Sequence, residues 1–149
     1  MELKNQQNVD APIQRVYEAL NDPEVLKACI PGCESIEKVS ESGMVATVVL
    51  KIGPIKASFD GELEIKDLDA PTRYTLEFKG SGGSAGDARG SASVVLEEAG
   101  PEETVINYDV QADVNGKIAA VGGRLINSTA NMLSKKFFKN LGEVLEQPA

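Results

Sequence analysis

Strict alternation of apolar and polar residues predicts β-structure in the middle of the chain. Between residues 55 and 66 every second residue is apolar or small and the residues between them are polar. A period of two is that of a strand with one covered and one solvated face. Similar patterns predict strands over residues 3–9, 35–41, 44–52, 73–80, 87–97 and 104–114. Short turns join the last six strands, which predicts an antiparallel meander.

Helical spacing replaces this alternation in two regions. Asp10-Ala11-Pro12 and Asp22-Pro23 are helix-start signals, in which Asp is the N-cap and Pro lies in the first turn. They predict a helix over residues 12–21 and a shorter one over residues 24–29. From Lys117 to Glu146 apolar residues form one broad stripe that no proline interrupts. At 1.5 Å per residue this helix is on the order of 40 Å long, enough to cross a sheet.

The predicted fold class is α+β. About seven antiparallel strands curve around the long C-terminal helix, and two short helices follow the first strand. The length of 149 residues suits one domain, and no repeat or low-complexity linker divides the chain. We therefore expect a single domain spanning residues 1–149.

Small residues are unusually frequent on the apolar face of this sheet. They are Ala57, Gly61, Gly80, Ala88, Gly90, Ala92 and Ala112. The covering helix contains Gly122-Gly123, although each glycine costs a helix about 1 kcal/mol relative to alanine. Facing small residues either allow close backbone approach or leave a cavity, which would suit an apolar ligand. The alternative is a close-packed core with glycines at bulges and bends.

The composition excludes several kinds of chemistry. The chain has neither histidine nor tryptophan, and it has two cysteines. Without histidine, Ser-His and Cys-His nucleophile systems and histidine-containing zinc sites are excluded. Cys29 and Cys33 alone cannot complete a four-ligand zinc site. We therefore predict no catalytic residues, no metal site and no cofactor.

Charge and hydropathy restrict the partners and the location. Lys and Arg number 15 and Asp and Glu number 23, which gives a formal charge of −8. Such a chain repels phosphate backbones, so we predict no nucleic-acid partner. No stretch of 18 apolar residues and no apolar leader is present, which predicts a cytoplasmic protein.

Two short motifs have alternative interpretations. The segment from Gly80 to Ala85 matches the glycine-rich dinucleotide fingerprint, but the pattern that follows predicts a strand rather than the required helix. A glycine-rich hairpin is therefore the favoured interpretation. Cys29 and Cys33 flank the Ile30-Pro31-Gly32 break, where they are either a redox or metal pair or packed small side chains.

Charged side chains raise two further alternatives. The acidic residues of the strands lie on the polar faces and predict a solvated surface rather than a catalytic carboxylate pair. Lys135, Lys136 and Lys139 flank Phe137 and Phe138 near the end of the long helix. These lysines either complement the helix C-terminal dipole or form a small patch that touches a membrane or a partner.

Four stretches resemble the CoxG family of carbon monoxide dehydrogenase subunits, which belongs to the START/Bet v 1-like (SRPBCC) superfamily. They are ALNDPEVLKACIPGCESIE (19–37), KIGPIKASFDGELEI (51–65), GSGGSAGDARGSA (80–92) and VNGKIAAVGGRLINSTANMLSKKFF (114–138). The resemblance implies the helix-grip fold, in which a curved sheet surrounds a C-terminal helix. It also implies a non-catalytic accessory protein, encoded with molybdenum hydroxylases of the CO dehydrogenase type. Members of this family commonly have an aromatic residue where Asp87 stands.

The superfamily commonly holds lipids, sterols or other apolar molecules between sheet and helix, which leaves two functional hypotheses. The first is a carrier or adaptor that binds a lipid-, isoprenoid- or quinone-like molecule and serves the hydroxylase. The second is a cyclase- or hydrolase-like enzyme acting on a small hydrophobic substrate. The absence of histidine and of acid–base pairs on the apolar strand faces favours the first.

For either hypothesis we predict a cavity and an entrance at one end of the long helix. The predicted cavity is lined by Phe59, Leu63, Leu76, Phe78, Tyr108, Val110, Leu125, Thr129 and Leu133. The predicted entrance comprises Ile30, Pro31, Gly32, Gly82, Gly83 and Gly86, where glycines widen the accessible backbone conformations. We expect weak, transient contact with the inner face of the membrane, assisted by Lys135, Lys136, Phe138 and Lys139.

Overall fold

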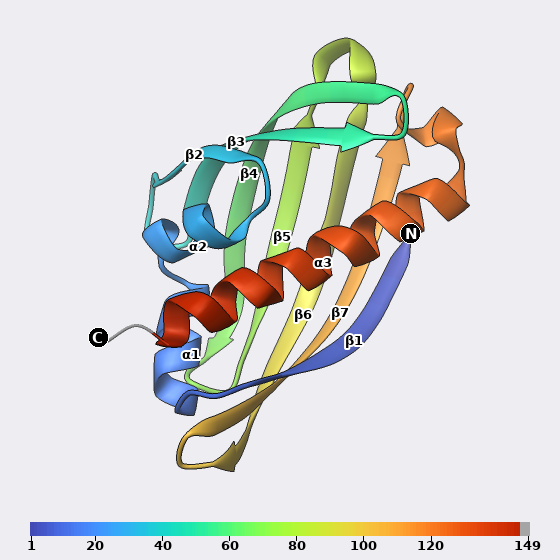
Figure 1. The fold of residues 1–149 in the computed structure, drawn as a ribbon. Helices are drawn as coiled ribbons and strands as arrows, with labels where there is room; N and C mark the ends of the chain where they lie inside the picture. The colour runs from blue at the N-terminus through green and yellow to red at the C-terminus, as the bar shows by residue number, and fades with distance from the viewer. Residues whose placement is uncertain (147–149) are drawn as a thin grey trace.

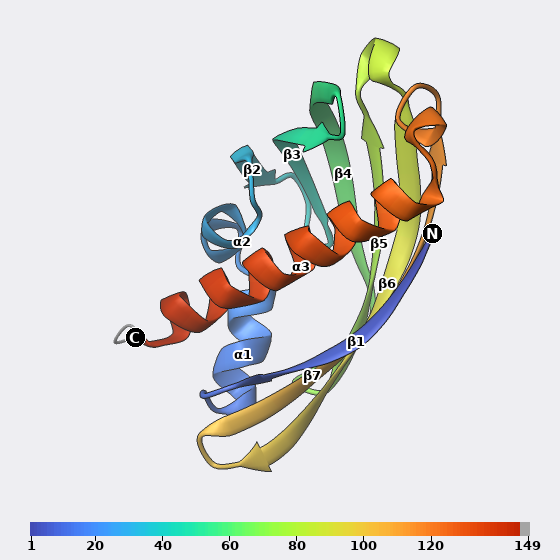
Figure 2. The same cartoon turned by 45° about the vertical axis from the view of Figure 1, so that its right-hand side comes forward.

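Seven antiparallel strands form one curved sheet, and a long C-terminal helix crosses its concave face (Figures 1 and 2). This architecture is seen in a computed structural model that describes residues 1–146, so residues 147–149 of the predicted domain lie outside the described residues. The elements are β1 (Glu2–Val9), α1 (Ile13–Leu20), α2 (Pro23–Cys29), β2 (Cys33–Lys38), β3 (Gly43–Ile52), β4 (Ile55–Asp69), β5 (Arg73–Ser81), β6 (Asp87–Gly100), β7 (Glu103–Asn115) and α3 (Gly123–Glu146). Two short 3-10 turns, η1 (Gly83–Ala85) and η2 (Ala119–Val121), precede β6 and α3.

The strand order is β1-β7-β6-β5-β4-β3-β2. Each of the strands β2 to β7 pairs with its neighbour in sequence, and β1 adds to the far edge beside β7. The helices α1 and α2 make the connection between the two edge strands, β1 and β2. The predicted seven-stranded meander, with two short helices after the first strand, is confirmed.

The two short helices begin differently. The Asp22 carboxylate caps α2 by accepting a hydrogen bond of 2.9 Å from the backbone N–H of Glu24, and Pro23 occupies the first turn as predicted. Helix α1 has Pro12 at its N-cap position and no side-chain cap. The prediction of Asp10 as the cap of α1 is therefore wrong.

The long helix begins six residues later than predicted. After η2, Gly122 has a φ of 96°, which an α-helix cannot contain and which glycine adopts at little cost. The regular helix begins at Gly123 and continues to Glu146. Its 24 residues span about 36 Å, still enough to cross the sheet diagonally (Figure 2).

Most buried apolar side chains belong to two separate clusters, and Met44, Ala46, Ala92 and Ala112 are buried outside both. The lower cluster joins α1, α2, the C-terminal part of α3 and the adjoining parts of the strands; its buried members are Val9, Ala11, Val16, Tyr17, Ala19, Leu20, Cys29, Tyr74, Val94, Leu96, Ile106, Tyr108, Leu141 and Leu145. The upper cluster consists of Phe59, Ala85 and Ile118, with partly buried Leu50, Ile52, Ile55, Ala57 and Val114 around them. The core is therefore divided between two ends of the fold.

Candidate functional site

Between the two clusters, the inner face of the sheet has almost no side chains along one row of paired residues. Ala46, Gly61, Gly80 and Ala88 pair across the adjacent strands β3 to β6. A Cβ atom built on Gly61 would lie 3.6 Å from the Lys79 carbonyl oxygen, and one built on Gly80 would lie 3.9 Å from the Asp60 carbonyl oxygen. No atom of α3, all of which is described, would lie within 4 Å of either. These two glycines leave space above the sheet instead of allowing close helix contact.

The next row of paired residues contains larger side chains. Leu63 and Phe78 pair across β4 and β5 and are half-buried, although both are large and apolar. Gly90 pairs with Phe78 on the following strand. A Cβ atom at Gly90 would collide with the Gln111 carbonyl oxygen, so this glycine allows a close backbone approach between β6 and β7. The alternative of close backbone approach therefore applies at Gly90 and not at Gly61 or Gly80.

The N-terminal half of α3 is loosely packed. Leu141 and Leu145, near the C-terminal end, are the two buried residues of α3. Leu125, Thr129 and Leu133 are half-buried, and Met132 is 57% exposed. Leu125 reaches the β3–β4 turn, because its Cδ2 atom lies 2.5 Å from the position that a Cβ of Gly53 would occupy.

The nine predicted cavity residues are distributed over three places. Phe59 belongs to the upper cluster, and Tyr108 belongs to the lower cluster with partly buried Leu76 and Val110 packed against it. The other five are half-buried and belong to neither cluster: Leu63, Phe78, Leu125, Thr129 and Leu133. Whether they line a ligand cavity stays a prediction.

Tyr108 marks the lower end of the loosely packed region. Its hydroxyl shares a hydrogen bond of 2.8 Å with the hydroxyl of Ser134, which connects β7 to α3. Its ring stacks on Phe138, with centroids 5.0 Å apart and an interplanar angle of 26°. Phe138 is therefore half-buried against the lower cluster, and its predicted membrane contact stays a prediction.

The predicted entrance residues lie in two separate places. Gly82 lies beneath the Phe59 ring in the upper cluster, since a Cβ there would be 2.5 Å from Phe59 Cε1. Gly83 has a φ of 61° with nothing within 4 Å of a Cβ position, and Gly86 packs against the backbone of Asn115. Ile30-Pro31-Gly32 instead follows α2, where Gly32 packs against the backbone of Val49 in β3.

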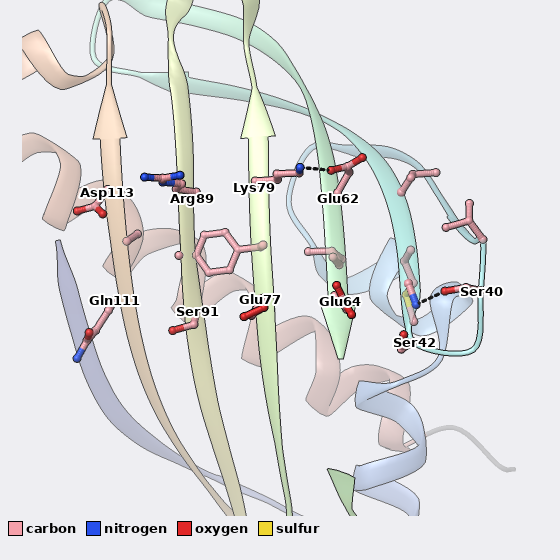
Figure 3. Close-up of a pocket in the computed structure, with 18 of the residues that line it drawn as sticks. Ser40, Ser42, Glu62, Glu64, Glu77, Lys79, Arg89, Ser91, Gln111 and Asp113 are labelled. Atoms are coloured by element: carbon pink, nitrogen blue, oxygen red, sulfur yellow. Dashed lines mark hydrogen bonds and ion pairs between the residues drawn. The ribbon is translucent and has the colours of Figure 1, made fainter. Parts of the chain in front are cut away.

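A hollow of about 1000 Å³ that the sequence did not indicate lies on the outer face of the sheet (Figure 3). Figure 3 views this face with α3 behind the strands. Its polar lining includes Glu62, Glu64, Glu77, Lys79, Arg89, Ser91, Gln111 and Asp113. Lys79 forms an ion pair with Glu62 at 2.9 Å, and Lys66 forms one with Glu77 at 2.6 Å. These side chains are exposed or half-exposed, so each pair contributes little to stability.

The cysteines do not form a reactive pair in this structure. Both are free thiols, with Cys29 buried and Cys33 half-buried. Burial raises the pKa of Cys29 to about 11 and also raises the pKa of Cys33 above its ordinary value. Because the thiolate is the nucleophile and the metal ligand, these shifts favour the packing interpretation.

Within residues 1–146, no group of three or more His, Cys, Asp or Glu side chains is placed to hold a metal ion. The same residues include no helix that is long and apolar enough to cross a membrane.

Comparison with known proteins gives both a family and a fold. The model of the CoxG family of carbon monoxide dehydrogenase subunits matches residues 6–146. A conserved protein from Geobacillus kaustophilus is 29% identical, with a TM-score of 0.92 over 98% of this chain and 95% of that one. No curated protein matches the chain in sequence.

More distant structures share the fold alone. A START superfamily protein from Mycobacterium smegmatis is 14% identical, with a TM-score of 0.75 over 98% of this chain and 97% of that one. The Zhui aromatase/cyclase from Streptomyces sp. R1128 is 15% identical, with a TM-score of 0.67 over 98% and 93% of the two chains. The predicted START/Bet v 1-like fold is thereby confirmed.

Proposed function

Because the chain belongs to the CoxG family of carbon monoxide dehydrogenase subunits, we propose that it is a non-catalytic accessory protein of a CO dehydrogenase-type molybdenum hydroxylase. In this role it holds an apolar lipid-, isoprenoid- or quinone-like molecule between the sheet and α3. The observation that carries the proposal is the lack of helix atoms above Gly61 and Gly80, in the interval between the two core clusters.

The lining of this interval suits an apolar ligand. Leu63 and Phe78 belong to the row of the sheet next to this interval, Leu133 belongs to α3, and each is half-buried. Completing the burial of a large apolar side chain stabilises by a fraction of the roughly 1.5–3 kcal/mol that full burial provides. A ligand seated here would therefore supply packing that the protein itself does not make.

The lining also favours a carrier over an enzyme. The predicted lining side chains outside both clusters are aliphatic, aromatic or hydroxyl groups, namely Leu63, Phe78, Leu125, Thr129 and Leu133. The Thr129 hydroxyl donates to the Leu125 carbonyl oxygen of its own helix at 2.8 Å. The aromatase/cyclase with the same fold keeps the enzyme hypothesis as the alternative.

Filling the space from the protein side tests the proposal. Gly61→Leu and Gly80→Leu would each project a side chain into the interval, and neither glycine has a positive φ that would strain the substitution. The matched control is Ser81→Leu, the next residue of β5, whose side chain lies on the opposite, exposed face.

Decylubiquinone binding is measured by isothermal titration calorimetry. We expect each inner-face variant to bind at least about tenfold more weakly, a change of about 1.4 kcal/mol. The control should bind as the wild type does, and all three variants should unfold at similar urea concentrations. If decylubiquinone binds all four proteins equally, or if the inner-face variants lose 1–3 kcal/mol through overpacking, the space is not a ligand site.

A further inference from the structure

The segment that ends in α3 carries positive charge in a protein that is otherwise acidic. Residues 114–142 contain Lys117, Arg124, Lys135, Lys136 and Lys139 and no Asp or Glu. The rest of the chain holds ten cationic residues and all 23 acidic ones, a formal charge of −13. Positive and negative residues are therefore segregated along the sequence.

Four of these cations form a stripe on the outside of α3. Arg124, Lys135, Lys136 and Lys139 are all exposed. At 100° per residue each lies about 100° or more around the helix from buried Leu141. No described carboxylate lies within the 4.0 Å ion-pair distance of any of them, since the described ion pairs both lie on the outer face of the sheet. We call these four residues the α3 stripe.

The helix dipole does not account for the α3 stripe. Its stabilising effect on cations is limited to the last turn of a helix. The last turn of α3 contains no basic residue and carries Glu143 and Glu146. Arg124 lies in the first turn, where the dipole disfavours a cation. The first of the two interpretations of the lysines is therefore wrong.

We propose that the α3 stripe is a docking surface for an acidic patch on a partner protein. From Arg124 to Lys139 it extends about 22 Å along the helix. Unpaired, exposed cations complement carboxylates on another protein, and they accelerate association in a manner that salt weakens. The identity of the partner rests on the proposed function, which makes the CO dehydrogenase-type hydroxylase the protein to test.

The side chains around the stripe favour a protein over a membrane. A helix that lies in a membrane interface presents several large apolar residues beside its lysines. Here Phe137 and Phe138 pack against the lower cluster, and Met132 is the exposed large apolar residue of α3.

Charge reversal locates the surface. The stripe variant is Lys135→Glu, Lys136→Glu, Lys139→Glu. The matched control is Lys4→Glu, Lys38→Glu, Lys56→Glu, which changes the net charge equally at three exposed lysines on strands β1, β2 and β4. Binding of each chain to purified CO dehydrogenase from the same host is measured by biolayer interferometry at 50 and 300 mM NaCl. We expect the stripe variant to associate at least tenfold more slowly at low salt, and the control less than threefold.

Equal loss in both variants, or loss in neither, overturns the proposal. The wild type is also tested on vesicles of 30% phosphatidylglycerol in phosphatidylcholine. If it binds these vesicles more tightly than the dehydrogenase, and the stripe variant does not bind them, the partner is a membrane and the proposal is overturned.

If the wild type does not bind the dehydrogenase, the proposed function loses its partner. Retention on immobilised poly-L-glutamate then tests whether the α3 stripe binds an acidic surface. Retention that the stripe variant loses and the control keeps supports an acidic complement. Any other retention pattern overturns it.

Discussion

The two halves of α3 are buried to different extents against the sheet. The C-terminal half buries Leu141 and Leu145 completely or nearly so, with 0% and 4% exposure, against large side chains such as Tyr74 and Leu96. The N-terminal half has no buried residue, and none of its atoms lies within 4 Å of a Cβ position at Gly61 or Gly80. One helix thus combines an anchored half with a loosely packed half.

This difference separates the residues that stabilise the fold from those that are available for binding. Local stability in proteins is uneven, and ligand sites commonly occupy regions with few buried contacts. In this fold the lower cluster contains most of the clustered buried apolar side chains, and the interval above it contains few. The following substitutions test whether the two halves differ as described.

The largest difference in the free energy of unfolding is expected between alanine substitutions at two leucines of α3. Leu141→Ala removes a side chain with no solvent exposure and should lower the free energy of unfolding by about 2–5 kcal/mol. Leu133→Ala removes a half-buried one and should cost less than half as much. Urea unfolding followed by circular dichroism measures both. Equal losses would show that the helix packs uniformly along its length.

The glycines of the inner face should also divide into two groups. Gly90→Ala places a Cβ against the Gln111 carbonyl oxygen and should destabilise the protein by about 2–3 kcal/mol, because the strand backbones must separate. Gly80→Ala meets only ordinary contacts and should change stability by no more than about 0.5 kcal/mol. Thermal unfolding of the two variants gives the comparison. A large loss at Gly80 would mean that the space above it is filled.

The lower cluster should make stability fall at alkaline pH. Burial raises the pKa of Cys29 to about 11 from its ordinary 9.0, so the folded state holds this proton more tightly than the unfolded state. The contribution is fully present below about pH 9 and is lost as the pH rises to about 11, on the order of 2 kcal/mol. Cys29→Ala should abolish that part of the decline, measured by urea unfolding between pH 8 and 11. Parallel pH profiles for the two proteins would contradict the burial of this thiol.

The smallest difference concerns two hydroxyls of α3. Ser134→Ala removes the hydrogen bond to Tyr108 that joins helix and sheet, and should cost about 1 kcal/mol. Thr129→Ala removes a bond within the helix itself and should change the free energy of unfolding by less than about 0.5 kcal/mol. Differential scanning calorimetry distinguishes the two, and the double variant Ser134→Ala with Tyr108→Phe tests whether the loss belongs to this pair. A loss at Thr129 as large as at Ser134 would place the helix–sheet junction elsewhere.

The architecture could be predicted because the alternation of apolar and polar residues and the short turns are both determined by residues close together in the sequence. Alternation over residues 55–66 places β4 and its covered face, and short turns between successive strands require antiparallel neighbours. The start of α3 was missed because helical periodicity continues through Gly122. The positive φ that ends it is fixed by the turn from η2 and not by side-chain pattern.

The candidate site could be predicted only in part. The sequence indicates that Gly61 and Gly80 share the inner face, but not whether the helix approaches them. The spacing of apolar residues along α3 identifies which residues share one face of the helix, but not how the helix is rotated against the sheet. That rotation places Leu125 against the turn at Gly53 and Phe138 on the ring of Tyr108. Those contacts depend on where distant elements come together.

The pair Gly122-Gly123 makes the start of α3 less constrained than its C-terminal end. Neither glycine has any atom within 4 Å of a Cβ position, so no side chain of another element packs on these two residues. The far end is held by Leu141 and Leu145. A rigid rod fixed at one end and jointed at the other moves most near the joint. If the space between sheet and helix changes volume, we expect the displacement to be larger around Arg124 and Leu125, beside the β3–β4 turn, than at buried Leu141 and Leu145.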